Sequence, residues 1–230
     1  MSDQDALIPR VLLVRHGETE WARSGRYTSH TDIGLTPEGI AQLSSMAAKI
    51  VGAGNLLDPS RLEHIFVSPR KRARETFKLL LRGSSGGAQW EERVTYTEDI
   101  AEWNYGDYEG LLVNEIRELR KKKGLDCERQ WDIWRDGSMW QVTERLDGLI
   151  SRIREIQTPY MNGAKPADVL IVAHGLVLRC FIKRWLGFSV DFPLQMKMDP
   201  GAITVLSYKN HEPAIHISIA LPFTDGSTCR

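Results

Sequence analysis

Cysteine is scarce in this sequence, which has only Cys127, Cys180 and Cys229 among its 230 residues. These three are widely spaced and form no C-x-x-C pair, a pattern that fits neither a disulfide framework nor a zinc site. The simplest interpretation is a reducing compartment, so we expect a cytoplasmic protein. The first ten residues carry Asp3 and Asp5 and no long apolar core, so we expect neither a signal peptide nor a membrane span there.

An excess of charge of either sign is also missing. Thirty Lys and Arg residues balance thirty Asp and Glu residues, and the sequence pI is near 7.0. Without a bulk positive field the chain is not expected to bind nucleic acid or a membrane, and any affinity for an anion must come from a local cluster. The absence of a G-x-x-x-x-G-K-[ST] motif argues against a P-loop nucleotide triphosphatase. The absence of an aspartate-rich cluster at suitable spacing argues against a metal-assisted phosphatase.

Two nearly identical apolar segments are present in the sequence. Residues 11–14 are apolar and lead into Arg15-His16-Gly17, and residues 169–172 are apolar and lead into Ala173-His174-Gly175. Such runs are typical of strands that are buried on both faces in a parallel sheet covered by helices. Ligands bind outside the carboxyl ends of strands in sheets of this type. If the two strands are neighbours, both imidazoles project into one crevice.

Strands and helices alternate along the rest of the chain. Thr36-Pro37 has the form of a helix start, followed by a face of Ile40, Leu43, Ala47 and Ile50, and Ser68-Pro69 is predicted to open a second helix in the same way. Further helices are predicted over 142–156 and 177–186, and further strands over 63–67, 94–97, 202–208 and 214–220, with a turn at 210–213. This pattern predicts an α/β fold with three layers (α/β/α), a mostly parallel central sheet and helices on both faces. We expect one domain over 1–230.

The stretch 103–140 differs in character from the rest. It contains four of the seven tryptophans, Trp103, Trp131, Trp134 and Trp140, and a helix-like segment over 113–123. One interpretation is a helical, aromatic lid laid over the strand ends. The other is that these side chains simply fill the core, as most buried tryptophans do.

A crevice that holds His16, Arg15, His174 and Arg72 would match a phosphate dianion. Guanidinium groups bond phosphate oxygens in a planar fork, and a neutral imidazole could attack phosphorus in line to give a phosphohistidine that water then hydrolyses. The leaving alkoxide needs a proton, and Glu102 is the best candidate for the donor. A helix cap or a salt bridge to an arginine is an equally open role for Glu102.

Four segments then carry a resemblance: Arg15-His16-Gly17-Glu18-Thr19, the run from Ser68 to Thr76, Glu102 before Gly106-Asp107-Tyr108-Glu109-Gly110, and Ala173-His174-Gly175. In this order they resemble the motifs of the histidine phosphatase superfamily, in its phosphoglycerate-mutase-like branch. The resemblance implies that His16 is the nucleophile and that Arg15, Arg72 and His174 form the phosphate pocket. It also implies that Glu102 is the proton donor and later the base for water, with no metal and no cofactor.

A narrower resemblance, to sugar bisphosphatases of this superfamily, is carried by Glu20-Trp21 and by residues 24–28, 102–110, 115–120 and 131–137. It implies substrate contacts by Thr28 and Ser29, a place for Tyr105 beside the acid, and backbone contact from Gly201 and Ala202. It also implies that Arg179 reaches a second phosphate. The loop between Gly187 and Pro200 is brief, at a place where substrate specificity could be set.

The sequence therefore predicts a metal-independent phosphatase of a small sugar or sugar-alcohol phosphate, with sedoheptulose 1,7-bisphosphate among the candidates. One alternative is a phosphoglycerate-type mutase, which must exclude water; the polar end of the chain at 223–230 offers little to close a site. The other is a protein-phosphatase-like regulator, which needs a wide, shallow mouth for a peptide. The sequence leaves open whether the chain forms a homo-oligomer.

Overall fold

The computed structural model describes residues 8–83, 92–126, 131–133 and 139–216, and its centre is a six-stranded sheet in the order β3-β2-β4-β1-β5-β6. The strands are β1 (Val11–Arg15), β2 (Leu62–Val67), β3 (Val94–Tyr96), β4 (Asp168–Ala173), β5 (Ile203–Lys209) and β6 (Glu212–Ile215). β3, β2, β4 and β1 are parallel, and β5 and β6 add antiparallel strands beyond β1. The prediction of a mostly parallel sheet is confirmed.

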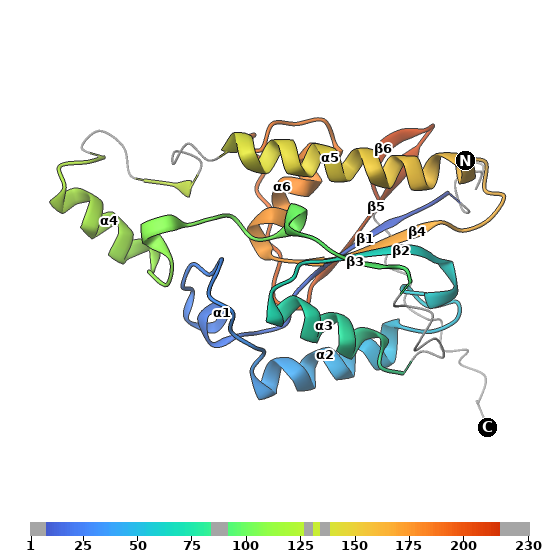
Figure 1. Cartoon of the computed structure of the whole chain (residues 1–230), viewed down its shortest axis with the longest axis horizontal. Coiled ribbons are helices and arrows are strands. Elements are labelled where there is room, and N and C mark those ends of the chain that lie inside the picture. Colours follow the sequence, from blue (N-terminus) through green and yellow to red (C-terminus); the bar gives the residue numbers. More distant parts are fainter. Residues whose placement is uncertain (1–7, 84–91, 127–130, 134–138, 217–230) are drawn as a thin grey trace, which may run out of the picture.

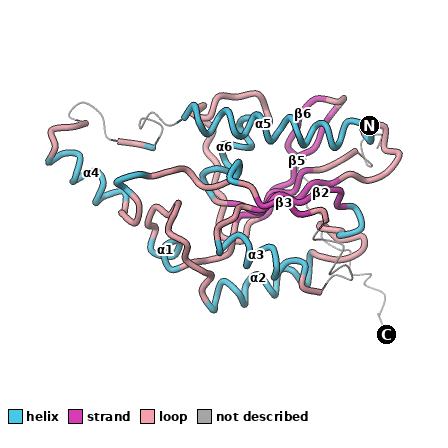
Figure 2. The backbone as a smooth tube through the Cα atoms, in the orientation of Figure 1, coloured by secondary structure: helices cyan, strands magenta, loops and turns pink. Residues whose placement is uncertain are grey.

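Helices cover both faces of this sheet. The helices are α1 (Glu20–Ser24), α2 (Pro37–Ile50), α3 (Lys71–Leu81), α4 (Val113–Lys122), α5 (Met139–Gln157) and α6 (Gly175–Trp185). Short 3-10 turns lie at Pro59–Arg61, Glu98–Ile100, Gly106–Tyr108 and Thr158–Tyr160. α2 and α3 lie on one face and α5 and α6 on the other, with the strands as a middle layer (Figures 1 and 2). The three-layer prediction is therefore confirmed, whereas the single domain over 1–230 stays a prediction.

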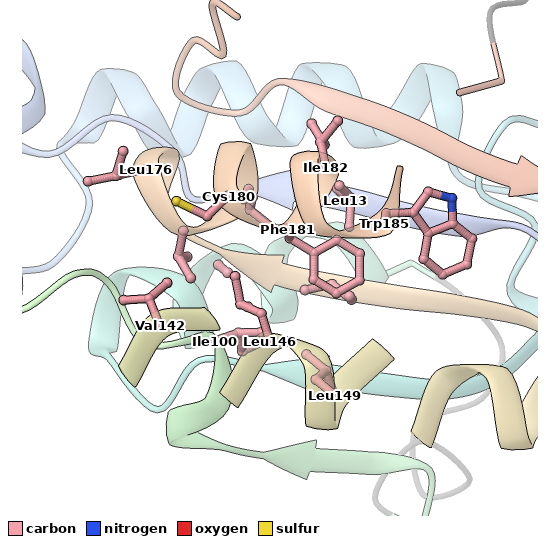
Figure 3. Packing of buried hydrophobic residues seen from close by; sticks show 14 of the residues in the cluster. Leu13, Ile100, Val142, Leu146, Leu149, Leu176, Cys180, Phe181, Ile182 and Trp185 are labelled. Atoms are coloured by element: carbon pink, nitrogen blue, oxygen red, sulfur yellow. The ribbon is translucent and has the colours of Figure 1, made fainter. Parts of the chain in front are cut away.

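The larger part of the core lies between the sheet and the pair α5–α6. Leu146 and Leu149 of α5 lie opposite Phe181 and Trp185 of α6 (Figure 3), and all four are fully buried. Cys180 is buried in the same layer, as expected for a small core residue, whereas the other two cysteines lie outside the described residues. No helix in the described part of the chain is long and apolar enough to cross a membrane.

Two predicted helix details need correction. α2 begins at Pro37 with Thr36 as its cap, as expected, but Ile40 is 41% exposed. Gly39 faces inward instead. α2 packs so closely at this position that a Cβ on residue 39 would lie 2.6 Å from the carbonyl oxygen of Glu18. α3 begins at Lys71 rather than at Ser68-Pro69, and its first N–H donates to Asp32 at 2.6 Å. Ser68 does not cap α3, because its hydroxyl faces His174.

The predicted turn at 210–213 is two residues too long. Asn210 and His211 have φ of 53° and 66°, which is the conformation of a two-residue hairpin loop. Glu212 already pairs with Lys209, and Pro213 pairs with Tyr208. Proline is tolerated there because β6 is an edge strand, where a ladder donor is not needed. The part of the expected last strand from residue 217 onward lies outside the described residues.

The tryptophan-rich stretch divides between the two interpretations. Trp103 and Trp131 are fully buried in the core, whereas Trp140 is 63% exposed at the start of α5. Trp134 lies outside the described residues. α4 and α1 lie together at the end of the molecule toward which β1 runs (Figure 1). The aromatic side chains thus fill core at two positions, and a lid over the strand ends stays a prediction.

Candidate active site

His16 lies at the carboxyl end of β1, beside the matching end of β4. Arg15 pairs with Ala173 in the parallel register, and the His16 N–H donates to the Ala173 carbonyl oxygen at 2.9 Å. The His16 side chain is almost completely buried, and its Nδ1 lies 2.8 Å from the carbonyl oxygen of Gly17. A carbonyl can only accept a hydrogen bond, so Nδ1 carries the proton and Nε2 keeps its lone pair. His16 is therefore oriented as a nitrogen nucleophile.

Gly17 fixes the turn that follows His16. A Cβ at this residue would lie 2.4 Å from Cδ1 of Leu43, so the close packing of α2 leaves room only for glycine. The Gly17 N–H donates to Oγ1 of Thr76 at 3.0 Å, and Thr76 is fully buried in α3. The His-Gly pair seen in the sequence is thus a packing requirement as well as a strand end.

His174 follows β4 and stands at the N-cap position of α6, with its ring edge toward the ring of His16 at a centroid distance of 5.2 Å. It is completely buried. Its Nδ1 accepts from Nε of Arg72 at 3.1 Å, and its Nε2 lies 2.7 Å from Oγ of Ser68. The predicted proximity of the two histidines is therefore present, but both nitrogens of His174 already have protein partners.

Both imidazoles are held neutral. Burial lowers the pKa of His16 well below its ordinary value, and the charges of Arg72 and then Arg15 lower it further. Burial also lowers the pKa of His174 well below its ordinary value, helped by Arg72 and His16. Both histidines are therefore unprotonated at neutral pH, which a nucleophilic nitrogen requires.

This burial predicts acid sensitivity of the fold. The unfolded chain binds a proton on each imidazole near pH 6.5, whereas the folded chain does so only at lower pH, so stability is fully present above about pH 6.5 and falls below it. Each of the two histidines contributes a slope of up to about 1.4 kcal/mol per pH unit. Urea unfolding from pH 7.5 to 5.5 measures this slope. His174→Asn should reduce the slope by the contribution of one proton, and an unchanged slope in His174→Asn would contradict the assignment.

The two arginines occupy different positions around His16. Arg15 lines a cavity, donates from Nη1 to the Met198 carbonyl at 2.6 Å, and packs on Gly175, where a Cβ would lie 3.1 Å from Nε of Arg15. Arg72 is completely buried and does not line the cavity. Its Nη groups donate to the carbonyl oxygens of Thr28, Ser29 and Thr31. Burial lowers the pKa of both guanidinium groups.

Glu102 joins the cavity to the start of α6. Its Oε1 accepts from the N–H groups of Trp103 and Val177, both at 2.9 Å, and its Oε2 accepts from Leu176 at 3.1 Å. Glu102 is 9% exposed and lines the cavity. The carboxylate therefore caps α6 and also faces the cavity, whereas its role as proton donor stays a prediction.

The cavity has a volume of about 700 Å³, within the range of small-molecule sites. The lining includes six of the residues predicted from the sequence, namely Arg15, His16, Thr28, Glu102, Tyr105 and Arg179. Tyr105 is buried, which raises its pKa well above the ordinary value. Arg179 is partly buried and donates from Nε to the Gly175 carbonyl at 3.1 Å.

Three predicted substrate contacts are not available in this arrangement. Ser29 is buried, and its N–H donates to both carboxylate oxygens of Glu109 at 2.8 and 2.9 Å. The Gly201 N–H donates to the carbonyls of Arg15 and His16, and the Ala202 N–H donates to that of Asp199. None of the three lines the cavity. The Gly201 backbone, expected to contact substrate, instead binds the end of β1.

Sequence reasoning missed part of the lining. Trp21, Arg26 and Tyr27 line the cavity and belong to the stretches 20–21 and 24–28 that carried the narrower resemblance, whereas the missed residues 195–199 come from the loop before β5. The only signal for the latter was the brevity of the loop between Gly187 and Pro200. In the described part of the chain, no group of three or more His, Cys, Asp or Glu side chains could hold a metal ion.

Comparison with known proteins agrees with this geometry. The family described as "Histidine phosphatase superfamily (branch 1)" matches residues 11–218. The chain is 37% identical to the sedoheptulose 1,7-bisphosphatase of Saccharomyces cerevisiae, over 93% of each chain, and 32% identical to an acid phosphatase of Mycobacterium tuberculosis, over 87% of each. A solved structure of an open reading frame from Mycobacterium tuberculosis superimposes with a TM-score of 0.69 at 28% identity, covering 91% of this chain and 96% of that one. This chain belongs to branch 1 of the histidine phosphatase superfamily.

Proposed function

We propose that this protein hydrolyses the phosphate ester of a small sugar or sugar-alcohol phosphate through a phosphohistidine on His16. The observation that carries the proposal is the state of that side chain. Its imidazole is neutral, its Nε2 keeps its lone pair because Nδ1 is bound to the Gly17 carbonyl, and it lies in a cavity with arginine side chains and the carboxylates of Glu102 and Asp199. Such a site suits phosphoryl transfer, in which positioning and charge stabilisation supply most of the catalysis.

In the first step, the Nε2 lone pair of His16 attacks phosphorus as the bond to the ester oxygen breaks. The leaving alkoxide takes a proton from the Glu102 carboxyl group. Oε2 is the oxygen suited to carry this proton, because it accepts one backbone hydrogen bond and Oε1 accepts two. Arg15 faces the transferred group from the cavity wall, and Arg72 adds its charge from behind His16.

In the second step, water attacks the phosphohistidine. The Glu102 carboxylate accepts a proton from that water, the P–N bond breaks, and inorganic phosphate leaves with His16 again neutral. Glu102 therefore acts first as acid and then as base, which returns the site to its starting state. The positive charge that these steps require comes from arginine side chains.

The size and lining of the cavity support a small, polar substrate. Arg26, Arg179 and Lys197 line it in addition to Arg15, and Trp21 and Tyr27 add aromatic faces. This lining suits a phosphorylated sugar with a second anionic group. The similarity to a sedoheptulose 1,7-bisphosphatase of yeast and to an acid phosphatase of Mycobacterium tuberculosis supports the same class.

The direct test is phosphate release, with EDTA present and no added metal, from a panel of substrates. The panel contains sedoheptulose 1,7-bisphosphate, fructose 1,6-bisphosphate, sugar and polyol monophosphates, 3-phosphoglycerate and a phosphopeptide. We expect the highest kcat/KM on a sugar phosphate. Isomerisation of 3-phosphoglycerate without phosphate release would favour a mutase instead, and preference for the phosphopeptide would favour a protein phosphatase.

Arg179→Ala should separate bisphosphate from monophosphate substrates. No described residue accepts a hydrogen bond from the Nη groups of Arg179, which leaves them available to a distal phosphate on the cavity side. Loss of such a charged hydrogen bond should cost roughly 1.5 to 3 kcal/mol of transition-state stabilisation for bisphosphates. This corresponds to a fall in kcat/KM of about 10- to 150-fold for bisphosphates, and the fall for monophosphates should be much smaller. Arg184→Ala is the control, because Arg184 of the same helix pairs with Asp147. Equal losses on both substrate types would refute the role.

A further inference from the structure

Ser68 is a completely buried serine that the proposed reaction does not use. It connects β2 to the start of α3, and its N–H donates to the Val172 carbonyl at 3.0 Å. Its Oγ lies 2.7 Å from Nε2 of His174. Ser68 does not line the cavity. Its hydroxyl therefore acts on the site only through the imidazole of His174.

The hydrogen bonds around His174 determine where its proton lies. Nε of Arg72 is a donor in every state of the guanidinium group, so Nδ1 of His174, 3.1 Å away, must be the acceptor. A neutral imidazole has one proton, which therefore sits on Nε2 and is donated to Oγ of Ser68. The opposite tautomer would place N–H against N–H at Arg72, whereas the Ser68 hydroxyl can pair with Nε2 in either tautomer, so Arg72 selects the tautomer and Ser68 anchors the ring.

We propose that Ser68 is a positioning residue that anchors Nε2 of His174 and thereby holds the ring, and Arg72 bound to it, in place beside His16. This inference rests on the proposed role of His16 as the nucleophile. The link to the reaction is the guanidinium group, because Arg72 donates to His174 with Nε and to the carbonyls of residues 28–31 with its Nη groups. Without the Ser68 hydroxyl the His174 ring is no longer anchored at Nε2, and Arg72 loses the fixed acceptor for its Nε.

Held in this place, Arg72 acts on His16 through its charge. After burial, Arg72 is the largest cause that keeps His16 unprotonated. The same charge stabilises the phosphoryl oxygens once the group has moved onto Nε2. A displaced Arg72 would lower the rate of transfer, whereas the residues that line the outer cavity and bind the rest of the substrate would be unchanged.

Kinetics provide the first test. Ser68→Ala should lower kcat about tenfold and change KM less than about threefold, since the substrate-lining residues are intact. Ser207→Ala is the matched control, because Ser207 is also buried and also makes one hydrogen bond, to the Pro9 carbonyl at 3.1 Å. In a His174→Asn background, Ser68→Ala should change kcat less than twofold. Another tenfold loss in that background would overturn the proposal.

Nitrogen NMR of the histidine rings provides the second test, and it does not depend on activity. The His174 signals are identified by their absence in His174→Asn. We expect Nε2–H in the native protein, in Ser207→Ala and in Ser68→Ala, with the Nε2–H proton signal moved upfield in Ser68→Ala because that proton has lost its acceptor. An Nε2–H signal that is unchanged in Ser68→Ala, or Nδ1–H in the native protein, would overturn the proposal. If the protein fails to release phosphate, the proposed function fails while this signal still tests the role of Ser68.

Discussion

His16→Ala should abolish turnover, with kcat falling by at least about 10⁴-fold on every substrate of the native enzyme. Alanine offers no lone pair to phosphorus, and the remaining site can only orient a water molecule poorly for direct attack. Acid-quenched native enzyme does not retain a P–N bond, which acid cleaves, whereas alkaline quenching preserves it. Labelled substrate followed by alkaline quench should therefore give a phosphoprotein with native enzyme and none with His16→Ala.

The control for this experiment is another histidine of the sheet. His64 on β2 makes one hydrogen bond, to Thr95 of β3, and does not line the cavity. His64→Gln should keep both turnover and the phosphoprotein. Circular dichroism should show that His16→Ala is folded. Retention of more than a few per cent of native activity in His16→Ala would rule out His16 as the nucleophile.

The sequence predicted the centre of this site well because its signal is local. Each apolar run ends in His-Gly, and the carboxyl ends of neighbouring parallel strands meet at one edge. The remaining condition is that the two strands are neighbours, and the parallel register of Arg15 with Ala173 meets it. The family motifs then supplied Arg15 and Glu102, which also line the cavity.

The details that sequence could not provide depend on partners far along the chain. Ser68-Pro69 reads as a helix start, but a buried imidazole 106 residues away takes the serine hydroxyl. Arg72 reads as a phosphate ligand, but three carbonyls of a loop about 40 residues earlier accept its Nη groups. Helix propensity and residue spacing describe only neighbours in the sequence, so they do not predict hydrogen bonds between residues that are far apart in the chain.

The outer cavity was the hardest part to predict, for a different reason. Residues 195–199 belong to no helix or strand, so no periodicity marks them. Gly201 and Ala202 were expected to offer backbone contact to substrate, yet the Gly201 N–H binds the end of β1 and the Ala202 N–H binds the Asp199 carbonyl. Substrate specificity depends on such irregular segments, which is why the chemistry of the site was more predictable than its preferred sugar.

Glu102→Gln should lower kcat/KM by about 10² to 10⁴-fold on sugar phosphates, because the alkoxide then leaves without a proton. The loss should be much smaller, about tenfold or less, on p-nitrophenyl phosphate, whose leaving group is stable as an anion. Hydrolysis of the phosphohistidine also needs Glu102 as a base, so the variant should accumulate phosphoenzyme. We therefore expect a burst of p-nitrophenolate equal to the enzyme concentration, measured by stopped flow.

The helix-capping role of Glu102 requires its own control, since a glutamine side chain cannot accept from all three N–H groups that the carboxylate now binds. Glu109 is a matched carboxylate, because it accepts from the N–H groups of Ser29 and Thr31 and does not line the cavity. Any loss in Glu109→Gln should be the same for both leaving groups. If Glu102→Gln also loses the same factor on sugar phosphate and p-nitrophenyl phosphate and shows no burst, then Glu102 only anchors α6, and the proton must come from another group in the cavity.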